Sequence, residues 1–310
     1  MPFGGSLRAS RVLFIILLVF SEQVEAETIP ACPTDSVIVP PSFCYVMLDQ
    51  LHPTQAVIGY TAAYFKQIEF ATIADPTKRS TYANLEEYLL HDASFTAVQS
   101  PEGDFYLADG HHNAKALWDL NLKCTACEPR RPLPAAQPIY LTVTASYFGH
   151  PLNKTAFWEQ LINTHNAYPY LINKQGLLEK VSAAEFAKKV PLNFDPHARN
   201  ALADYPLRSA TGLAKDLGWF KTPKDRANKS INFYQFHWAT CLIALGYKPK
   251  FEDNGQLSMD SVYKAIDLLD SKHDVEENCA AMITKFGSRI IPNRKSTQSI
   301  AENTVNGELL

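Results

Sequence analysis

The residues Asp109-Gly110-His111-His112 stand where a predicted strand ends and a predicted helix begins, and their types suit chemistry on a phosphate group. A glycine turn leads into the helix, whose first backbone N–H groups have no internal partner and carry partial positive charge. A helix N-terminus of this kind binds anions. Lys115 lies four and three residues beyond the two histidines, so we expect it to face the same anion. The sequence therefore predicts a phosphate site at this turn.

The side chains at the turn also suit proton transfer. Histidine titrates near neutral pH, so His111 or His112 can act as general base or acid, and Asp109 can orient or deprotonate the imidazole. One alternative is that Asp109 merely caps the helix beside exposed loop histidines. A metal site at the two histidines is disfavoured, because adjacent residues point in different directions and no HxxxH pair accompanies them. Asp109, His111 and His112 are the candidate catalytic residues.

Strand and helix patterns divide the chain into two halves. Up to about residue 150, strand-like runs alternate with stretches of helical spacing, and the later residues are almost wholly helical in pattern. This order indicates an α/β or α+β half followed by a helical half. The expected strands are residues 43–48, 95–99, 105–108 and 139–146; residues 52–55 are an expected turn; the expected helices are residues 56–70, 82–90, 111–120, 156–165, 183–189, 206–217, 231–245, 259–271 and 275–286.

The composition is that of a globular protein. The 310 residues carry 29 Lys and Arg against 32 Asp and Glu, a formal net charge of -3, and 46% of them are hydrophobic. Disorder, collagen-like repeats and coiled coil are therefore disfavoured. A generic nucleic-acid binder is disfavoured as well, because phosphate binding normally requires a marked basic excess.

The first 26 residues have the pattern of a secretory signal peptide. Two arginines precede the apolar run 12–20, and a polar segment ends in Val24-Glu25-Ala26, which suits signal peptidase. No later segment reaches the roughly 20 apolar residues that a membrane span requires. We expect cleavage after Ala26, a secreted or periplasmic protein without a membrane span, a leader at 27–45 and a disordered tail at 287–310.

Six cysteines follow the expected signal peptide. An even number in an exported chain favours up to three disulfides, but the sequence does not choose among the pairings. Cys124 and Cys127 have the spacing of a redox motif or of half a zinc site. We interpret them as a loop-closing disulfide, because no second pair with this spacing is present. The cysteines are Cys32, Cys44, Cys124, Cys127, Cys241 and Cys279.

Several ordered motifs resemble those of a known family. The run 109–112, preceded by a strand–turn pattern, resembles the DGHH motif of the ParB-like nuclease family, a branch of the ParB/sulfiredoxin superfamily. The resemblance covers about residues 46–246 and implies an α+β fold. A small mixed sheet with helices would occupy residues 46–150, and a mostly helical extension packed on it would occupy residues 151–286. The other matching segments are residues 51–55, Phe157-Trp158, residues 204–209 and residues 233–239.

The resemblance also implies what the turn binds. The superfamily places such a glycine turn and helix N-terminus under a nucleotide or phosphate, which assigns that role to Gly110. Asn113 stands where relatives carry a phosphate-binding arginine, and Lys115 is expected to substitute for it. His111 stands where sulfiredoxin has its reactive cysteine, so rescue of oxidised thiols is not expected.

Further candidate binding residues lie outside the turn. Lys66 and Arg208 would neutralise phosphate charge, and Gln55 would add a neutral donor. Two structural alternatives are a solvated Lys66 and an ion pair between Arg208 and Asp204, one helical turn apart. We interpret the aromatic residues of 233–239 as core packing rather than a base-stacking platform. They are Phe233, Tyr234, Phe236 and Trp238; Gln235 and His237, between them, could instead reach the pocket.

Together these features predict phosphodiester hydrolysis or nucleotide-dependent phosphoryl transfer. A nucleotide, a nucleic acid or another phosphate-containing ligand would be the partner. The sequence does not decide the cofactor, and a nucleotide or a divalent metal is compatible with this chemistry. The alternative is a non-catalytic exported binding module or effector that retains the anion cradle. The net charge of -3 counts against a long polyanion as substrate, because it provides no electrostatic footprint for one.

Overall fold

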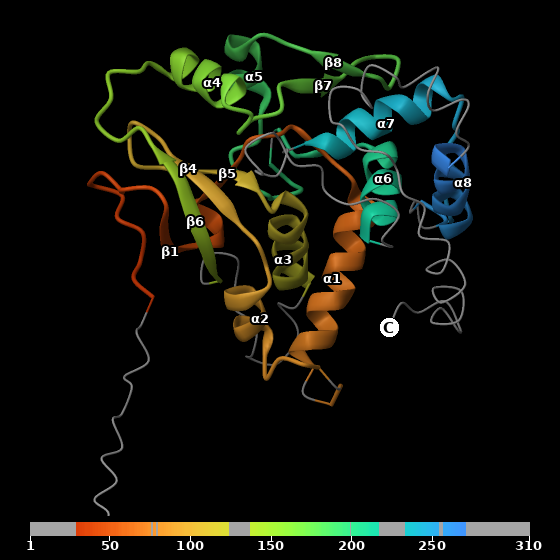
Figure 1. Ribbon diagram of the computed structural model, residues 1–310, viewed down its shortest axis with the longest axis horizontal. Coiled ribbons are helices and arrows are strands. Elements are labelled where there is room, and N and C mark those ends of the chain that lie inside the picture. The colour runs from red at the N-terminus through yellow and green to blue at the C-terminus, as the bar shows by residue number, and fades with distance from the viewer. Residues whose placement is uncertain are drawn as a thin grey trace, which may run out of the picture.

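The computed structural model describes residues 29–75, 77–78, 80–123, 137–198, 200–216, 233–253 and 257–270 (Figure 1). The expected signal peptide, the Cys124 and Cys127 pair, the expected helix at 275–286 and the expected tail lie outside these ranges. Among the described helices, none combines the length and the apolar character needed to cross a bilayer.

A five-stranded mixed sheet has the strand order β1-β6-β4-β5-β2. β1 (Ser42–Met47) pairs antiparallel with β6 (Pro138–Ser146), which runs parallel to β4 (Thr96–Gln99). β4 and β5 (Phe105–Asp109) form an antiparallel hairpin, and β5 runs parallel to β2 (Leu51–Pro53). The four expected strands are confirmed. The turn expected at residues 52–55 is wrong for residues 52 and 53, which belong to β2. Pro53 cannot donate a hydrogen bond to the sheet, but β2 is an edge strand, and an edge strand tolerates a proline.

Three helices cover one face of this sheet. α1 (Tyr60–Ala74), α2 (Leu85–His91) and α3 (His111–Lys123) share a hydrophobic core with the strands. Alternate residues of a strand face opposite sides, so Leu107 of β5 joins this core. The helices thus fix α3 directly beneath the end of β5 (Figure 1).

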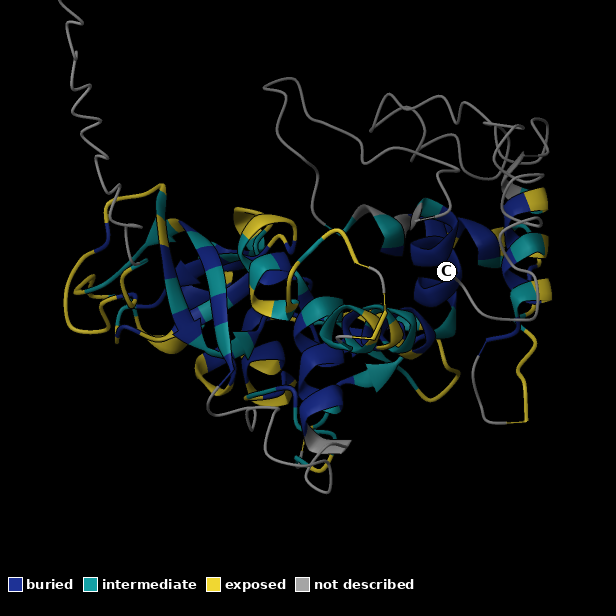
Figure 2. Cartoon of the chain, turned by 90° about the horizontal axis from the view of Figure 1, so that it is seen from below, coloured by how far each residue is buried: buried dark blue, intermediate teal, exposed yellow. Residues whose placement is uncertain are grey.

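Two further helices pack on the opposite face. α4 (Lys154–Asn163) and α5 (Ala183–Lys189) bury Trp158 and Phe186 against Val98 of β4. A two-stranded hairpin accompanies them, with β7 (Tyr170–Ile172) antiparallel to β8 (Leu178–Lys180). Figure 2 shows buried residues running through the sheet and the inner helix faces, with exposed residues gathered in the outer loops.

The remaining helices form a third core beside α1. α6 (Pro206–Asp216), α7 (Tyr234–Ala244) and α8 (Met259–Asp270) pack together and against α1. The short strands β3 (Val57–Ile58) and β9 (Ala203–Asp204) pair in parallel and lead into α1 and α6 respectively. The architecture is therefore α+β, a small mixed sheet with helices and a mostly helical C-terminal half.

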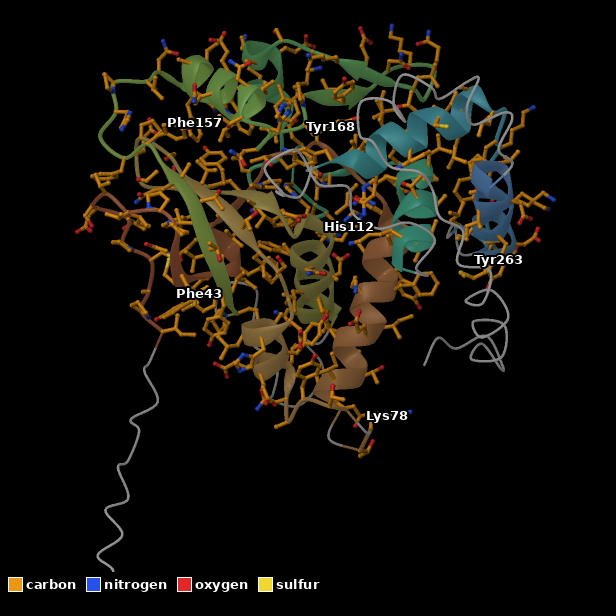
Figure 3. The ribbon with its side chains drawn as sticks, in the orientation of Figure 1. Phe43, Lys78, His112, Phe157, Tyr168 and Tyr263 are labelled. Atoms are coloured by element: carbon orange, nitrogen blue, oxygen red, sulfur yellow. A yellow bond between two sulfur atoms is a disulfide. The ribbon has the colours of Figure 1, made fainter. Side chains whose placement is uncertain are left out.

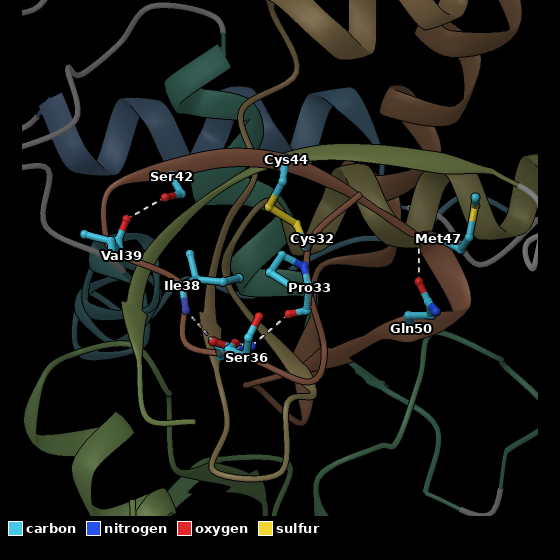
Figure 4. Close-up of a disulfide and its surroundings, with 10 residues drawn as sticks. Cys32, Pro33, Ser36, Ile38, Val39, Ser42, Cys44, Met47 and Gln50 are labelled. Atoms are coloured by element: carbon cyan, nitrogen blue, oxygen red, sulfur yellow. Dashed lines mark hydrogen bonds between the residues drawn. A yellow bond between two sulfur atoms is a disulfide. The ribbon is translucent and has the colours of Figure 1, made fainter. Parts of the chain in front are cut away.

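The segment before β1 lies against the sheet (Figure 4). A disulfide joins Cys32 to Cys44 of β1. The fully buried Gln99, at the end of β4, donates to the carbonyl oxygens of Pro33 at 2.9 Å and Ser36 at 3.0 Å. Residues 29–41, expected as part of a leader, are thus held to the sheet by one covalent bond and by hydrogen bonds from Gln99.

Candidate functional site

Three helices begin close together near the middle of the molecule. β3 and β9 run parallel, so their carboxyl ends lie side by side and α1 and α6 begin next to each other. Gly59, immediately before α1, allows this approach, because a Cβ there would lie 2.5 Å from Oγ and 2.6 Å from N of Ser209. α1 packs against α3 on its other side (Figure 1). The partial positive charges of three helix N-termini are therefore directed at one region.

Backbone N–H groups in the first turn of α1 donate hydrogen bonds to side chains from elsewhere in the chain. The N–H of Tyr60 donates to Asp204 Oδ1 at 2.8 Å, and the N–H of Ala62 donates to Ser209 Oγ at 3.3 Å. Burial raises the pKa of Asp204, while the N–H groups of Tyr60 and Tyr205 oppose that rise. Asp204 thus caps α1, a role that the sequence pattern did not indicate.

The first turn of α3 is different. Its first backbone bond runs from Ala114 N–H to the carbonyl of Gly110 at 2.9 Å. The N–H groups of His111, His112 and Asn113 precede that bond and have no acceptor within the helix. Asn113 is half-buried. Three backbone donors at this turn therefore have no partner within α3.

Gly110 sets the direction of that turn. Its φ is +98°, and a Cβ there would lie 2.9 Å from the carbonyl oxygen of Ser94 and 2.7 Å from the ring of Phe95. Only glycine adopts this positive φ without strain and leaves out the Cβ for which there is no space. The exposed Asp109 accepts a hydrogen bond from the N–H of Gly110 at 2.8 Å, so its carboxylate lies on the turn itself.

His111 is fixed as a neutral acceptor. It is 4% exposed, and its Nε2 accepts a hydrogen bond from the N–H of Thr54 at 3.1 Å. The Thr54 hydroxyl donates to the carbonyl of Leu107 at 2.6 Å, which holds Thr54 in place. Burial, and then the charge of Arg208, lower the pKa of His111 to about 3. His111 is therefore uncharged at neutral pH, in contrast to the near-neutral titration expected of it.

His112 is half-buried and faces two donors. Its Nε2 lies 3.4 Å from the N–H of Gly59, and its Nδ1 lies 3.4 Å from Nη2 of Arg208. A neutral imidazole has one donor and one acceptor, so it cannot satisfy both groups. Burial, then Arg208, and more weakly His111, Lys215 and Lys66, hold the pKa of His112 well below its usual range. Two donors thus face an imidazole that has one acceptor, at the place where α3, α1 and α6 meet (Figure 3).

Arg208 supplies the charge of the site. It lies in the first turn of α6 and is 8% exposed. Its guanidinium carbon is 5.3 Å from the centroid of the Phe236 ring, a cation–π contact, while Nη2 reaches His112. The carboxylate of Asp204, which the sequence offered as an ion-pair partner, accepts a hydrogen bond from the N–H of Tyr60. Arg208 is therefore positioned between a histidine and an aromatic ring.

Each of the two candidate lysines forms an ion pair with a carboxylate on its own helix. Lys115 is 3% exposed, and its Nζ pairs with Asp119 at 2.5 and 2.6 Å and lies 5.2 Å from the Tyr60 ring centroid. Lys66 pairs with Glu69 at 2.7 Å. The structure thus brings His111, His112 and Arg208 together, and directs both lysine side chains to carboxylates.

Gln55 is the remaining candidate. It is 3% exposed, and within the described part of the chain its amide nitrogen has no hydrogen-bond partner. Its backbone forms a bridge with Tyr168, a residue that the sequence analysis did not select and for which no motif gave a signal. Across the described ranges, no three His, Cys, Asp or Glu side chains are grouped so that they could hold a metal ion.

Three aromatic residues of 233–239 pack in or against the third core. Phe236 and Trp238 are buried in the third core, as expected. Phe233 is half-buried and packs against the same core, also as expected, and its ring centroid lies 6.3 Å from that of His111. Gln235 is half-buried, and the side chains of Tyr234 and His237 lie outside the described part of the structure.

The chain is an α+β protein with a mixed sheet. Its polar site contains two histidines and an arginine and lies where α1, α3 and α6 begin. The chain belongs to the family described as "Putative ParB-like nuclease", whose model matches residues 44–244. It is also similar to the crystal structure of protein Atu1540 from Agrobacterium tumefaciens, at 21% sequence identity and a TM-score of 0.49, over 77% of this chain and 96% of that one. No curated protein matches it.

Proposed function

We propose that the protein binds the phosphate group of a phosphodiester at the N-terminus of α3 and hydrolyses it. We call the backbone N–H groups of His111, His112 and Asn113, together with the side chains of His112 and Arg208, the anion site. The observation that carries the proposal is the position of His112 between two donors that it cannot both satisfy. A phosphate oxygen accepts from several donors at once and would satisfy them. Membership of a nuclease family supports the same class of ligand.

The reaction follows from the protonation states. In the free protein His112 is neutral, so it is ready to take a proton from an attacking water. The negative charge of a bound phosphate opposes that of Arg208 and raises the pKa of His112, which makes it a stronger base. The water oxygen bonds to phosphorus, its proton passes to His112, the bond to the leaving oxygen breaks, and that oxygen takes a proton from solvent. Arg208 and the N–H groups of α3 stabilise the charge on the phosphoryl oxygens.

Replacing either histidine tests the catalytic proposal. We expect His112→Ala to lower the hydrolysis rate of a phosphodiester by about 100-fold or more, the usual contribution of a general base. His111→Ala should lower it as well, because it releases Thr54 and the first turn of α3. Turnover of a nucleic acid and of a chromogenic phosphodiester is the measurement. His150→Ala, which changes an exposed histidine, is the control. Unchanged turnover in a variant that carries both His111→Ala and His112→Ala would refute the assignment.

A second candidate is binding without turnover. The observation that favours it is that His111 is buried and already hydrogen-bonded, which leaves only one half-buried imidazole for chemistry. Thermal denaturation with inorganic phosphate, nucleotides or nucleic acid separates the two cases, since a ligand stabilises the fold with or without turnover. Stabilisation without product formation would favour the binding module.

We also infer that the protein is exported, with residues 1–26 as signal peptide. The apolar run with its cleavage pattern, and the disulfide between Cys32 and Cys44, support this inference. N-terminal sequencing of the protein recovered outside the cytoplasm should begin at Glu27. A mature chain that still begins at residue 1 would contradict it.

A further inference from the structure

The start of α4 carries a sequence pattern that the proposed reaction does not use. Asn153-Lys154-Thr155 has the form Asn-X-Thr with a middle residue other than proline. This form is the acceptor pattern for N-linked oligosaccharides, because the transferring enzyme recognises the amide of the asparagine together with the hydroxyl two residues further on. Modification then depends on how the fold presents the asparagine.

The side-chain amide of Asn153 has a fixed orientation. Asn153 is the N-cap of α4, and its Oδ1 accepts a hydrogen bond from the N–H of Ala156 at 3.0 Å. Only the oxygen of an amide accepts, so Nδ2 is directed away from that N–H. Asn153 is exposed, and within the described part of the chain its Nδ2 has no hydrogen-bond partner. The fold therefore uses the amide oxygen and leaves the nitrogen, the atom that carries the oligosaccharide in glycoproteins.

The helix cap and an attached oligosaccharide are compatible. A bond to a sugar replaces one of the two hydrogens on Nδ2 and leaves Oδ1 as an acceptor, so the N–H of Ala156 keeps its partner. The side chains that hold α4 in place lie on its inner face, where Phe157 and Trp158 are buried against Val98 of β4. An oligosaccharide on the exposed Asn153 thus requires no change in the packing of α4.

The position of α4 also separates the modification from the anion site. α4 lies on the sheet face opposite α1, α2 and α3 (Figure 1). Phe157, one turn into α4, lies well apart from His112 (Figure 3). An oligosaccharide at the start of α4 therefore covers the outer surface of the molecule and leaves the start of α3 uncovered.

We propose that Asn153 carries an N-linked oligosaccharide in the exported protein. This inference rests on the proposed export, because the transferring enzyme acts on chains that enter the secretory pathway. The disulfide between Cys32 and Cys44 is typical of the same oxidising compartment. The donor is an oligosaccharide linked to a polyprenyl diphosphate. Nδ2 bonds to the anomeric carbon of the first sugar, the bond from that carbon to the diphosphate oxygen breaks, and the proton lost by Nδ2 leaves with the lipid diphosphate.

Mass spectrometry of the full chain, secreted from a eukaryotic cell line, tests the site. Treatment with a peptide N-glycosidase releases the oligosaccharide and converts the linked asparagine to aspartate, so the peptide that contains Asn153 should show that conversion. Asn153→Asp and Thr155→Ala should each lose one whole oligosaccharide from the mass of the secreted protein. The first variant keeps an acceptor for the helix cap, and the second keeps Asn153 itself. Thr155→Ser, which restores the hydroxyl, should keep the oligosaccharide.

Asn84→Asp is the matched control. Asn84 is also an exposed N-cap, and it accepts from the N–H of Glu87 at 2.9 Å, but Glu86 stands where the pattern requires a hydroxyl. The mass of the attached oligosaccharide should therefore stay unchanged in this variant.

The outcomes separate this inference from the proposed export. A secreted protein in which the Asn153 peptide is unmodified would overturn the modification site and leave export standing. A cytoplasmic chain that keeps residues 1–26 and carries no oligosaccharide would overturn both. An oligosaccharide that persists in Thr155→Ala would refute the assignment to Asn153 and point to Asn228-Lys229-Ser230, the other match to the pattern, which lies outside the described residues.

Discussion

Replacing Arg208 by methionine should weaken binding of inorganic phosphate by about ten- to a hundredfold, the value of one hydrogen bond to a charged group. Methionine preserves much of the buried volume but removes the guanidinium that lies between His112 and Phe236. The same change should raise the pKa of His112, because burial and then Arg208 are the largest causes that hold it low. Isothermal titration with phosphate and NMR titration of the imidazole measure the two effects.

Lys66→Met is the matched control for this prediction. It removes the same charge, but Lys66 is paired with Glu69 and ranks last among the causes of the low pKa of His112. We expect a smaller loss of phosphate affinity and a smaller rise in that pKa. Equal losses in the two variants would mean that only the total charge matters. A lower melting temperature of the unliganded Arg208→Met protein would show that Arg208 also stabilises the fold. Arg208→Lys then tests the charge alone, because lysine keeps the positive charge but lacks the planar guanidinium group.

Acid should destabilise the fold through the buried His111. Its folded pKa is about 3, below the ordinary value of roughly 6.5, so the unfolded chain binds a proton that the folded chain excludes. The stabilisation is therefore fully present above the unfolded pKa and declines as the pH falls below it. Linkage gives a loss of about 2 kcal/mol from this residue between about pH 8 and pH 5, and the low pKa of His112 acts in the same direction.

Urea denaturation across that pH range measures the loss. His111→Gln should remove about 2 kcal/mol of the pH dependence, because glutamine does not titrate. His150→Gln, at an exposed position, should leave it unchanged. An NMR titration gives an independent reading, since the imidazole of His111 should stay neutral in the folded protein down to about pH 5. A folded-state transition of His111 near pH 6.5 would contradict the prediction.

The sequence predicted much of the fold, because the signals involved are local. Strand-like runs bounded by turn residues marked β4 and β5, β-branched residues marked β6, and helical spacing marked the described helices, within a few residues of their observed ends. The start of α3 at His111 was predicted because a strand, a glycine turn and a helical pattern follow one another without interruption. The strands of two or three residues were missed, since segments so short carry no period.

What the sequence determined by itself was the helix N-terminus at Asp109-Gly110-His111-His112 and the chemical types displayed there. Only the tertiary structure decided which groups surround them. Thr54 and Gly59 are 57 and 53 residues from the histidines that they contact, and Arg208 is 96 residues away. The pairing of β2 with β5 places Thr54 beside His111, and the pairing of β3 with β9 places Gly59 beside the start of α6; no periodicity encodes either pairing. The pKa values of the two histidines also fall because burial in the assembled fold penalises their charged forms, a penalty that exists only once the chain has folded.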